Sequence, residues 1–108
     1  MVVLTRDRYI VFRAIVKSTV PNLTELKTTI WKKYETIFGL SGTSEAGLYF
    51  ETFDEKNGTG LIRCSSRSLS SLLTIFALIT KIKEDDVILL PLFISGLIKK
   101  AKAYLSNI

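Results

Sequence analysis

The sequence of 108 residues contains no histidine and one cysteine, Cys64. Histidine is the most frequent general base and the commonest metal ligand, so its absence removes the usual groups for proton transfer and metal binding. A single cysteine excludes an internal disulfide and any zinc or iron–sulfur site that needs several cysteines. We therefore expect no catalytic residue, no metal site and no bound cofactor, and we expect Cys64 to be a buried, inert thiol.

Long hydrophobic runs are also missing. The longest apolar stretches, such as residues 87–94, have the length of a strand and are too short to cross a membrane. The first residues, MVVLTRDR, lack the charged segment that precedes the apolar segment of a signal peptide. We therefore expect a cytoplasmic protein that does not contact membranes, and the length predicts a single domain over residues 1–108.

Acidic residues are in the minority, and the charge is unevenly distributed. The chain has 15 Lys+Arg and 10 Asp+Glu, which gives a formal net charge of +5. Residues 1–33 and 95–108 are basic, whereas residues 34–64 are acidic overall. Two basic ends favour contact with a polyanion. A hydrophobic content of 47% is high for a small domain and favours additional contact with protein partners.

Four segments have the composition of strands. Residues 8–16 have apolar side chains at every even position and a mixed set at the odd positions, which predicts a core face and a partly covered face. Residues 48–53 and 59–64 flank Asn57-Gly58, a strong hairpin signal. Residues 87–93 form a fourth strand, in which Pro91 predicts an edge position or a bulge.

Apolar residues at spacings of three and four predict a first helix that starts near Asn22 or Thr24 and stops at Gly39. The following residues 39–47, GLSGTSEAG, lack the spacing of a phosphate-binding loop. We interpret them as a flexible connector, with contact to another subunit as the alternative.

Two further helices are predicted. The second begins at Ser65 or Ser66 and carries a broad apolar face that extends to Ile82. The third covers residues 97–105, with apolar residues on one side and lysines on the other. We expect its apolar side to pack over the odd-numbered, mixed face of the first strand.

This order of elements predicts an α+β fold, a ferredoxin-like or RNA-recognition-motif-like βαββαβ sandwich with an extra C-terminal helix. An ordinary RNA-recognition motif carries aromatic residues on its third strand, and residues 59–64 contain none. Base stacking on an open sheet is therefore not expected. Contact with the RNA backbone through lysine and arginine remains open.

Several short sequences, in their order and spacing, resemble the smaller α/β protein subunit of archaeal ribonuclease P, a family with a eukaryotic counterpart. The similarity covers roughly residues 6–105 and rests on RYI at 8–10, FDEK at 53–56, TG at 59–60, RC at 63–64, ALIT at 77–80, Ile82, SG at 95–96 and IK at 98–99. Two departures stand out. Leu97 occupies a position that is usually threonine in the family, and the basic stretch ahead of the first strand is short.

The resemblance implies a non-catalytic subunit of a ribonucleoprotein endoribonuclease that removes the 5′ leader of precursor tRNA. In this family the RNA is the catalyst and uses Mg²⁺, and the protein pairs with a second, larger protein subunit. The resemblance further implies a homodimer within a heterotetramer, and only indirect contact with precursor tRNA.

Our hypothesis is that the protein contacts the ribonuclease P RNA through six basic residues: Arg6, Arg8, Arg13, Lys99, Lys100 and Lys102. The alternative from another class is a protein-binding or regulatory ferredoxin-like oligomerisation module that does not bind RNA. A small enzyme of the same fold is the third hypothesis.

Overall fold

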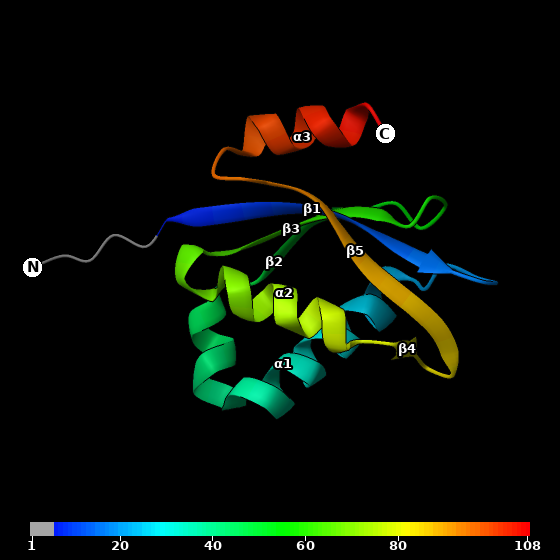
Figure 1. Ribbon diagram of the computed structural model, residues 1–108, viewed down its shortest axis with the longest axis horizontal. Coiled ribbons are helices and arrows are strands. Elements are labelled where there is room, and N and C mark those ends of the chain that lie inside the picture. Colours follow the sequence, from blue (N-terminus) through cyan, green and yellow to red (C-terminus); the bar gives the residue numbers. More distant parts are fainter. Residues whose placement is uncertain (1–5) are drawn as a thin grey trace, which may run out of the picture.

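The computed structural model describes residues 6–108 and contains one antiparallel sheet with helices on both faces (Figure 1). The elements in chain order are β1 (Asp7–Val16), α1 (Leu23–Ala46), β2 (Tyr49–Phe53), β3 (Thr59–Ser65), the short 3₁₀ helix η1 (Ser66–Ser68), α2 (Leu69–Leu78), β4 (Lys81–Ile82), β5 (Asp85–Ser95) and α3 (Ile98–Ser106). The strand order is β2-β3-β1-β5-β4. Helices α1 and α2 cover one face and α3 the other. The predicted ferredoxin-like sandwich with an extra C-terminal helix is confirmed.

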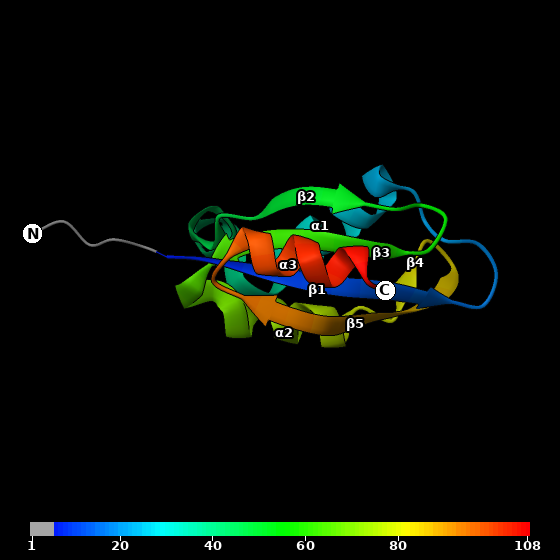
Figure 2. The ribbon, with the colours of Figure 1, turned by 90° about the horizontal axis from the view of Figure 1, so that it is seen from above.

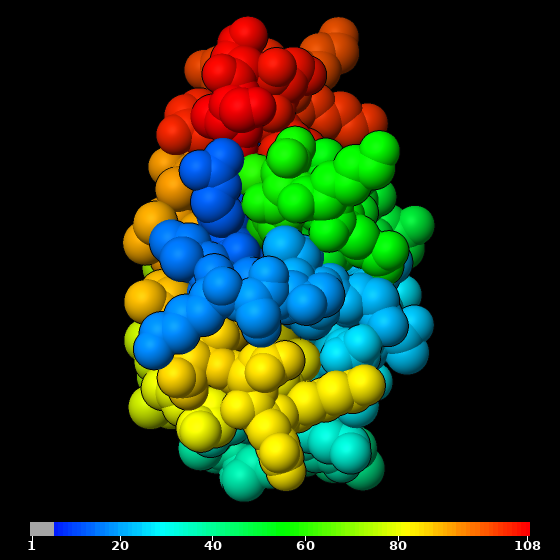
Figure 3. Space-filling model, turned by 90° about the vertical axis from the view of Figure 1, so that its right-hand side faces the viewer, coloured from blue at the N-terminus to red at the C-terminus, as the bar shows by residue number. Residues whose placement is uncertain are grey.

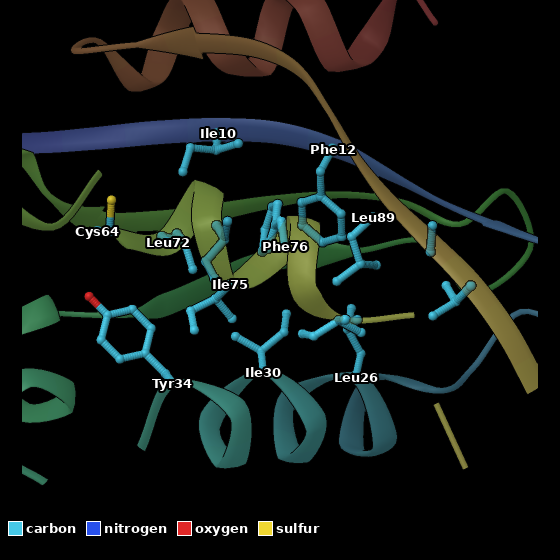
Figure 4. Packing of buried hydrophobic residues seen from close by; sticks show 14 of the residues in the cluster. Ile10, Phe12, Leu26, Ile30, Tyr34, Cys64, Leu72, Ile75, Phe76 and Leu89 are labelled. Atoms are coloured by element: carbon cyan, nitrogen blue, oxygen red, sulfur yellow. The ribbon is translucent and has the colours of Figure 1, made fainter. Parts of the chain in front are cut away.

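The main core lies between the sheet and helices α1 and α2 (Figure 4). In β1 the even-numbered residues Ile10, Phe12 and Ala14 are buried there, as their alternation predicts. They meet the apolar stripe of α1, of which Leu26 and Ile30 are fully buried. Burial of this much apolar surface is the main favourable contribution to folding.

A second, smaller cluster lies between the sheet and α3, the helix that Figure 2 shows lying over the strands. Val11 of β1 and Leu61 of β3 are fully buried beneath Ala101 of α3. Beside them, the rings of Phe93 and Tyr104 stack with their centroids 4.7 Å apart. The prediction that the C-terminal helix covers the odd-numbered face of β1 is therefore confirmed.

The start of α1 is fixed by a reciprocal cap. Asn22 accepts a hydrogen bond from the backbone N–H of Glu25 at 2.9 Å, and its side-chain amide donates to the Glu25 carboxylate at 2.7 Å. The first bond satisfies the Glu25 N–H, which lacks a partner within the helix, and the second holds the two side chains together. Asn22, one of the two predicted caps, is thus the one used.

The prediction of a flexible connector at residues 39–47 was wrong, because the chain returns to helix after a kink. Gly39 adopts φ 75° and ψ 176°, a conformation that is open essentially only to glycine, and helical geometry resumes after it. The Thr43 hydroxyl donates to the Gly39 carbonyl at 2.9 Å, and Thr43 and Ala46 are buried. Gly47 ends the segment in the left-handed region. Tertiary burial of small side chains therefore outweighs the low helix propensity of this sequence.

The second predicted helix is shorter than expected, since α2 ends at Leu78 and not near Ile82. Ile79 and Ile82 are still buried, but Ile82 lies in β4, which pairs with the first residues of β5. An apolar residue every third position fits both a helix and a helix followed by a short strand. Asp85 and Asp86 begin β5 and remain exposed.

Most of β5 is an edge strand, because β4 pairs only with Asp85 and Asp86. Opposite β1 the register shifts between Val11 and Phe12, whose partners are Phe93 and Pro91, so one residue bulges. The prediction that Pro91 marks an edge or a bulge is confirmed. Among residues 6–108, no helix has the length and apolarity needed to span a bilayer.

Candidate nucleic-acid interface

Two of the predicted RNA-binding residues, Arg6 and Arg8, lie at the start of β1, where the chain also turns into α3 (Figure 1). They line an open depression of about 540 Å³ together with Asp7 and Tyr9 of β1 and with Gly96 and Leu97 of that turn. Arg6 is exposed, whereas Arg8 is half-buried and donates to the carbonyl of Asp7 at 2.9 Å. A Cβ on Gly96 would lie 3.2 Å from Nη1 of Arg8, so the absence of a side chain there leaves room for the guanidinium.

The three lysines predicted to contact RNA, Lys99, Lys100 and Lys102, are all exposed on α3. They are exposed because Ile98, Ala101 and other apolar residues of the helix face the sheet. Residues 95–108 contain no acidic side chain that could neutralise them. The ion pairs found between described residues, Lys81–Asp86 and Lys83–Glu25, involve none of the six predicted residues. We name the joint surface of Arg6, Arg8, Lys99 and Lys100 the basic surface.

Arg13, the sixth predicted residue, is separated from this surface. It lies four residues beyond Tyr9 on β1, which corresponds to about 13 Å along a strand. Its neighbours across the sheet are Thr59 and Leu90, and it is half-buried. The structure therefore brings Arg6 and Arg8 to the start of α3 but leaves Arg13 near the other end of the sheet.

The first turn of α3 adds backbone donors to the basic surface. Helix α3 begins after Leu97, and no side chain caps it. The first N–H groups of a helix lack intrahelical partners and carry partial positive charge. With Leu97 58% exposed, this helix end lies at the protein surface, where it favours an anion.

The sequence did not reveal the surroundings of Arg63. Its guanidinium carbon lies 4.9 Å from the centroid of the Tyr49 ring, which is its direct cross-strand neighbour on β2. Neither of the ion pairs found between described residues involves Arg63. The register between β2 and β3 shifts around Glu51, which has no directly opposite residue on β3. The residue directly opposite Arg63 is Tyr49.

Cys64, next to Arg63, lies on the opposite face of β3 and is fully buried in the main core. Burial, reinforced by the charge of Asp7 and opposed by that of Arg8, raises the pKa of the Cys64 thiol to about 11. A thiol with such a pKa is protonated at neutral pH and is a poor nucleophile. The prediction that Cys64 is buried is confirmed, and its inertness stays a prediction.

Native protein should therefore resist thiol reagents at pH 8, while protein unfolded in guanidinium reacts at once. Between about pH 9 and 11 the unfolded thiol ionises and the buried one does not, so the free energy of unfolding falls as pH rises. Denaturant titrations at several pH values check this slope, and Cys64→Ala should reduce it. An equal slope in Cys64→Ala would contradict the assignment.

Comparison with known proteins extends over nearly the whole chain. Residues 8–106 match the model of the Rpp14/Pop5 family. The protein is 31% identical over 97 residues to ribonuclease P protein component 2 of Thermococcus kodakarensis, covering 90% of this chain and 80% of the relative. The protein of the same name from Archaeoglobus fulgidus is 32% identical over 98 residues, covering 91% and 86%.

A solved structure has the same fold. A chain in the cryo-EM structure of yeast ribonuclease MRP matches with a TM-score of 0.68, over 99% of this chain and 96% of that chain, at 8% sequence identity. At that identity the match concerns the fold alone. The family model, however, covers the sheet and the helices on both of its faces, from the second residue of β1 to the end of α3, and on this basis the chain belongs to the Rpp14/Pop5 family.

Proposed function

We propose that the protein is a non-catalytic, RNA-binding subunit of ribonuclease P that supports the catalytic RNA in removing the 5′ leader from precursor tRNA. The observation that carries this proposal is the basic surface, on a chain whose relatives are named ribonuclease P protein component 2. Arg6 and Arg8 line the depression where α3 starts, Lys99 and Lys100 follow in the first turn of that helix, and Asp7 is the acidic residue of the lining.

This surface is suited to phosphate contacts. Arginine and lysine side chains and helix N-termini make most protein contacts to nucleic-acid backbones, and they do so without reading sequence. Each neutralised phosphate releases counterions, so affinity should fall steeply as salt is raised. Arg13 and Lys102 extend the proposed contact along β1 and α3.

The proposed partners are the ribonuclease P RNA and a second, larger protein subunit, in a heterotetramer that contains a homodimer of this chain. Exposed apolar side chains near the kink of α1, namely Ile37, Phe38 and Leu40, support contact with protein. Mg²⁺ would act with the RNA, and no cofactor is assigned to this chain. Precursor tRNA would be contacted only indirectly, in the cytoplasm.

The proposal is tested by adding the protein with its larger partner subunit to ribonuclease P RNA at low Mg²⁺ and measuring cleavage of precursor tRNA. Wild-type protein should stimulate cleavage. Replacing Arg6, Arg8, Lys99 and Lys100 by alanine should lower RNA affinity at least about 10-fold and reduce the slope of log affinity against log salt by about 3.

The matched control replaces four other lysines by alanine, Lys17, Lys32, Lys33 and Lys56, which removes the same charge away from the start of α3. This control should retain most of the affinity. No stimulation by the wild type, or equal losses in the two variants, would contradict the proposal.

The same exposed apolar side chains also favour the second candidate function, an oligomerisation module that binds protein only. Size-exclusion chromatography combined with an RNA gel shift separates the two candidates. An oligomer that never shifts RNA would support the second one.

A further inference from the structure

Three side chains form a row across the face of the sheet that α3 only partly covers. Arg63 on β3 lies directly opposite Tyr49 on β2 and directly opposite Tyr9 on β1. Directly paired residues of antiparallel strands point to the same face, so the order across the sheet is tyrosine, arginine, tyrosine. Tyr9 packs against the cluster beneath α3, whereas Tyr49, on the outer strand β2, is 52% exposed.

The contact with Arg63 orients the Tyr49 ring. The guanidinium carbon lies 4.9 Å from the ring centroid, within the range of a cation–π contact. Arg63 is itself held in the sheet: it is half-buried, and its Nε atom is buried with no hydrogen-bond partner among the described residues. An aromatic ring that is ordered on one side and exposed on another loses little freedom when a ligand stacks on it.

The row lies next to the basic surface. Tyr9, one end of the row, lines the same depression as Arg6 and Arg8. Figure 2 shows the start of α3 at this end of the sheet, with β2 at the sheet's outer side. An RNA strand held there by its phosphates would pass close to an exposed aromatic ring.

We propose that Tyr49 is a stacking site for an unpaired base of the RNA that the basic surface binds, an inference that rests on the proposed function. Every base has a π face, so aromatic stacking tolerates any sequence. Bases within a duplex already stack on one another, and proteins stack on the bases of loops, bulges and ends. In this proposal the stacking ring comes from β2 and not from β3. The sequence-based expectation against base stacking rested on β3 alone, which contains no aromatic residue.

The test compares two RNA probes, a single-stranded adenosine-rich 12-mer that carries 2-aminopurine and a duplex of the same length. Tyr49→Ala should lower affinity for the single strand about 5- to 100-fold and abolish the change in 2-aminopurine fluorescence on binding. Its affinity for the duplex should stay within about 2-fold, because phosphate contacts are unchanged. Tyr49→Phe keeps the aromatic face and should bind both probes like the wild type.

Trp31→Ala is the matched control, since it removes another half-buried aromatic ring, from α1 on the other side of the sheet. It should bind both probes normally. If wild-type protein binds neither probe, the proposed function fails together with the stacking site. If wild-type protein binds both probes and Tyr49→Ala loses affinity for neither, only the stacking site is overturned. Tyr49→Ala could instead bind RNA normally and lose binding of the larger protein subunit. That result would assign the Tyr49 ring to protein contact and overturn the proposal.

Discussion

Replacing Phe12 by alanine is expected to lower the free energy of unfolding by about 3 to 5 kcal/mol, the range for a fully buried phenylalanine. The Phe12 ring is 0% exposed and lies between two other rings, with centroids 6.1 Å from Phe53 and 5.4 Å from Phe76. It also fills the space above Gly60, where a Cβ would lie 2.7 Å from Phe12 Cζ. Its removal would leave a cavity bounded by β3, the hairpin and α2, which the rigid sheet cannot close (Figure 4).

Denaturant unfolding followed by circular dichroism measures this loss. Phe93→Ala is the control, because it removes the same atoms from the opposite face of the sheet, where Phe93 is only half-buried against Tyr104. That variant should lose clearly less stability, since less apolar area returns to water. Equal losses would mean that the layer beneath α3 contributes as much as the main core.

The core could be predicted from the sequence because alternation in a strand fixes which face each residue occupies. Alternation in residues 8–16 predicts that Ile10, Phe12 and Ala14 share a core face, and all three are buried there. In the structure the same alternation places Cys64 in the core and Arg63 on the other face of β3. The helix over the odd-numbered face of β1 was predicted because that face carries apolar side chains such as Val11, which would otherwise be exposed to water.

The kinked end of α1 could not be predicted, because its helical form depends on contacts made far from it in sequence. The segment after Gly39 is rich in glycine and serine, which local preference assigns to a loop. In the structure Ala46 is buried in the main core, and the Glu45 carbonyl accepts a hydrogen bond from the Ser65 hydroxyl at 3.3 Å. Both contacts require the finished sheet.

The candidate site was predictable in part. Charge and the helix pattern identified the basic residues, and their convergence follows because β5 returns the chain to the start of β1, where Tyr9 pairs with Ser95. The stacking pair required the register between β2 and β3, including the shift around Glu51. A one-residue slip would place Tyr49 on the other face. Composition carries no information on such a slip, so the Tyr49–Arg63 contact could only be found in the structure.

Gly58→Ala should destabilise the protein by about 3 kcal/mol, because strain and a steric clash add at one residue. Gly58 has φ 74°, a region that costs other residues about 1 to 2 kcal/mol. A Cβ there would also lie 2.6 Å from the carbonyl oxygen of Ala14. The Ala14 N–H donates to the Gly58 carbonyl at 2.7 Å, so moving the hairpin to relieve the clash would break this buried bond.

The comparison that isolates the clash is Gly47→Ala. Gly47 also has a positive φ, 61°, but a Cβ there would be 3.8 Å from its nearest neighbour, the amide nitrogen of Ser65. We expect a loss of about 1 kcal/mol for Gly47→Ala, from backbone strain alone. The difference in lost stability between the two variants then measures how much the contact between the hairpin and β1 resists displacement. Figure 3 shows these two segments in direct contact, in green and blue. If both variants lost the same stability, the hairpin tip would be free to move away from Ala14, and the short contact would not constrain β1.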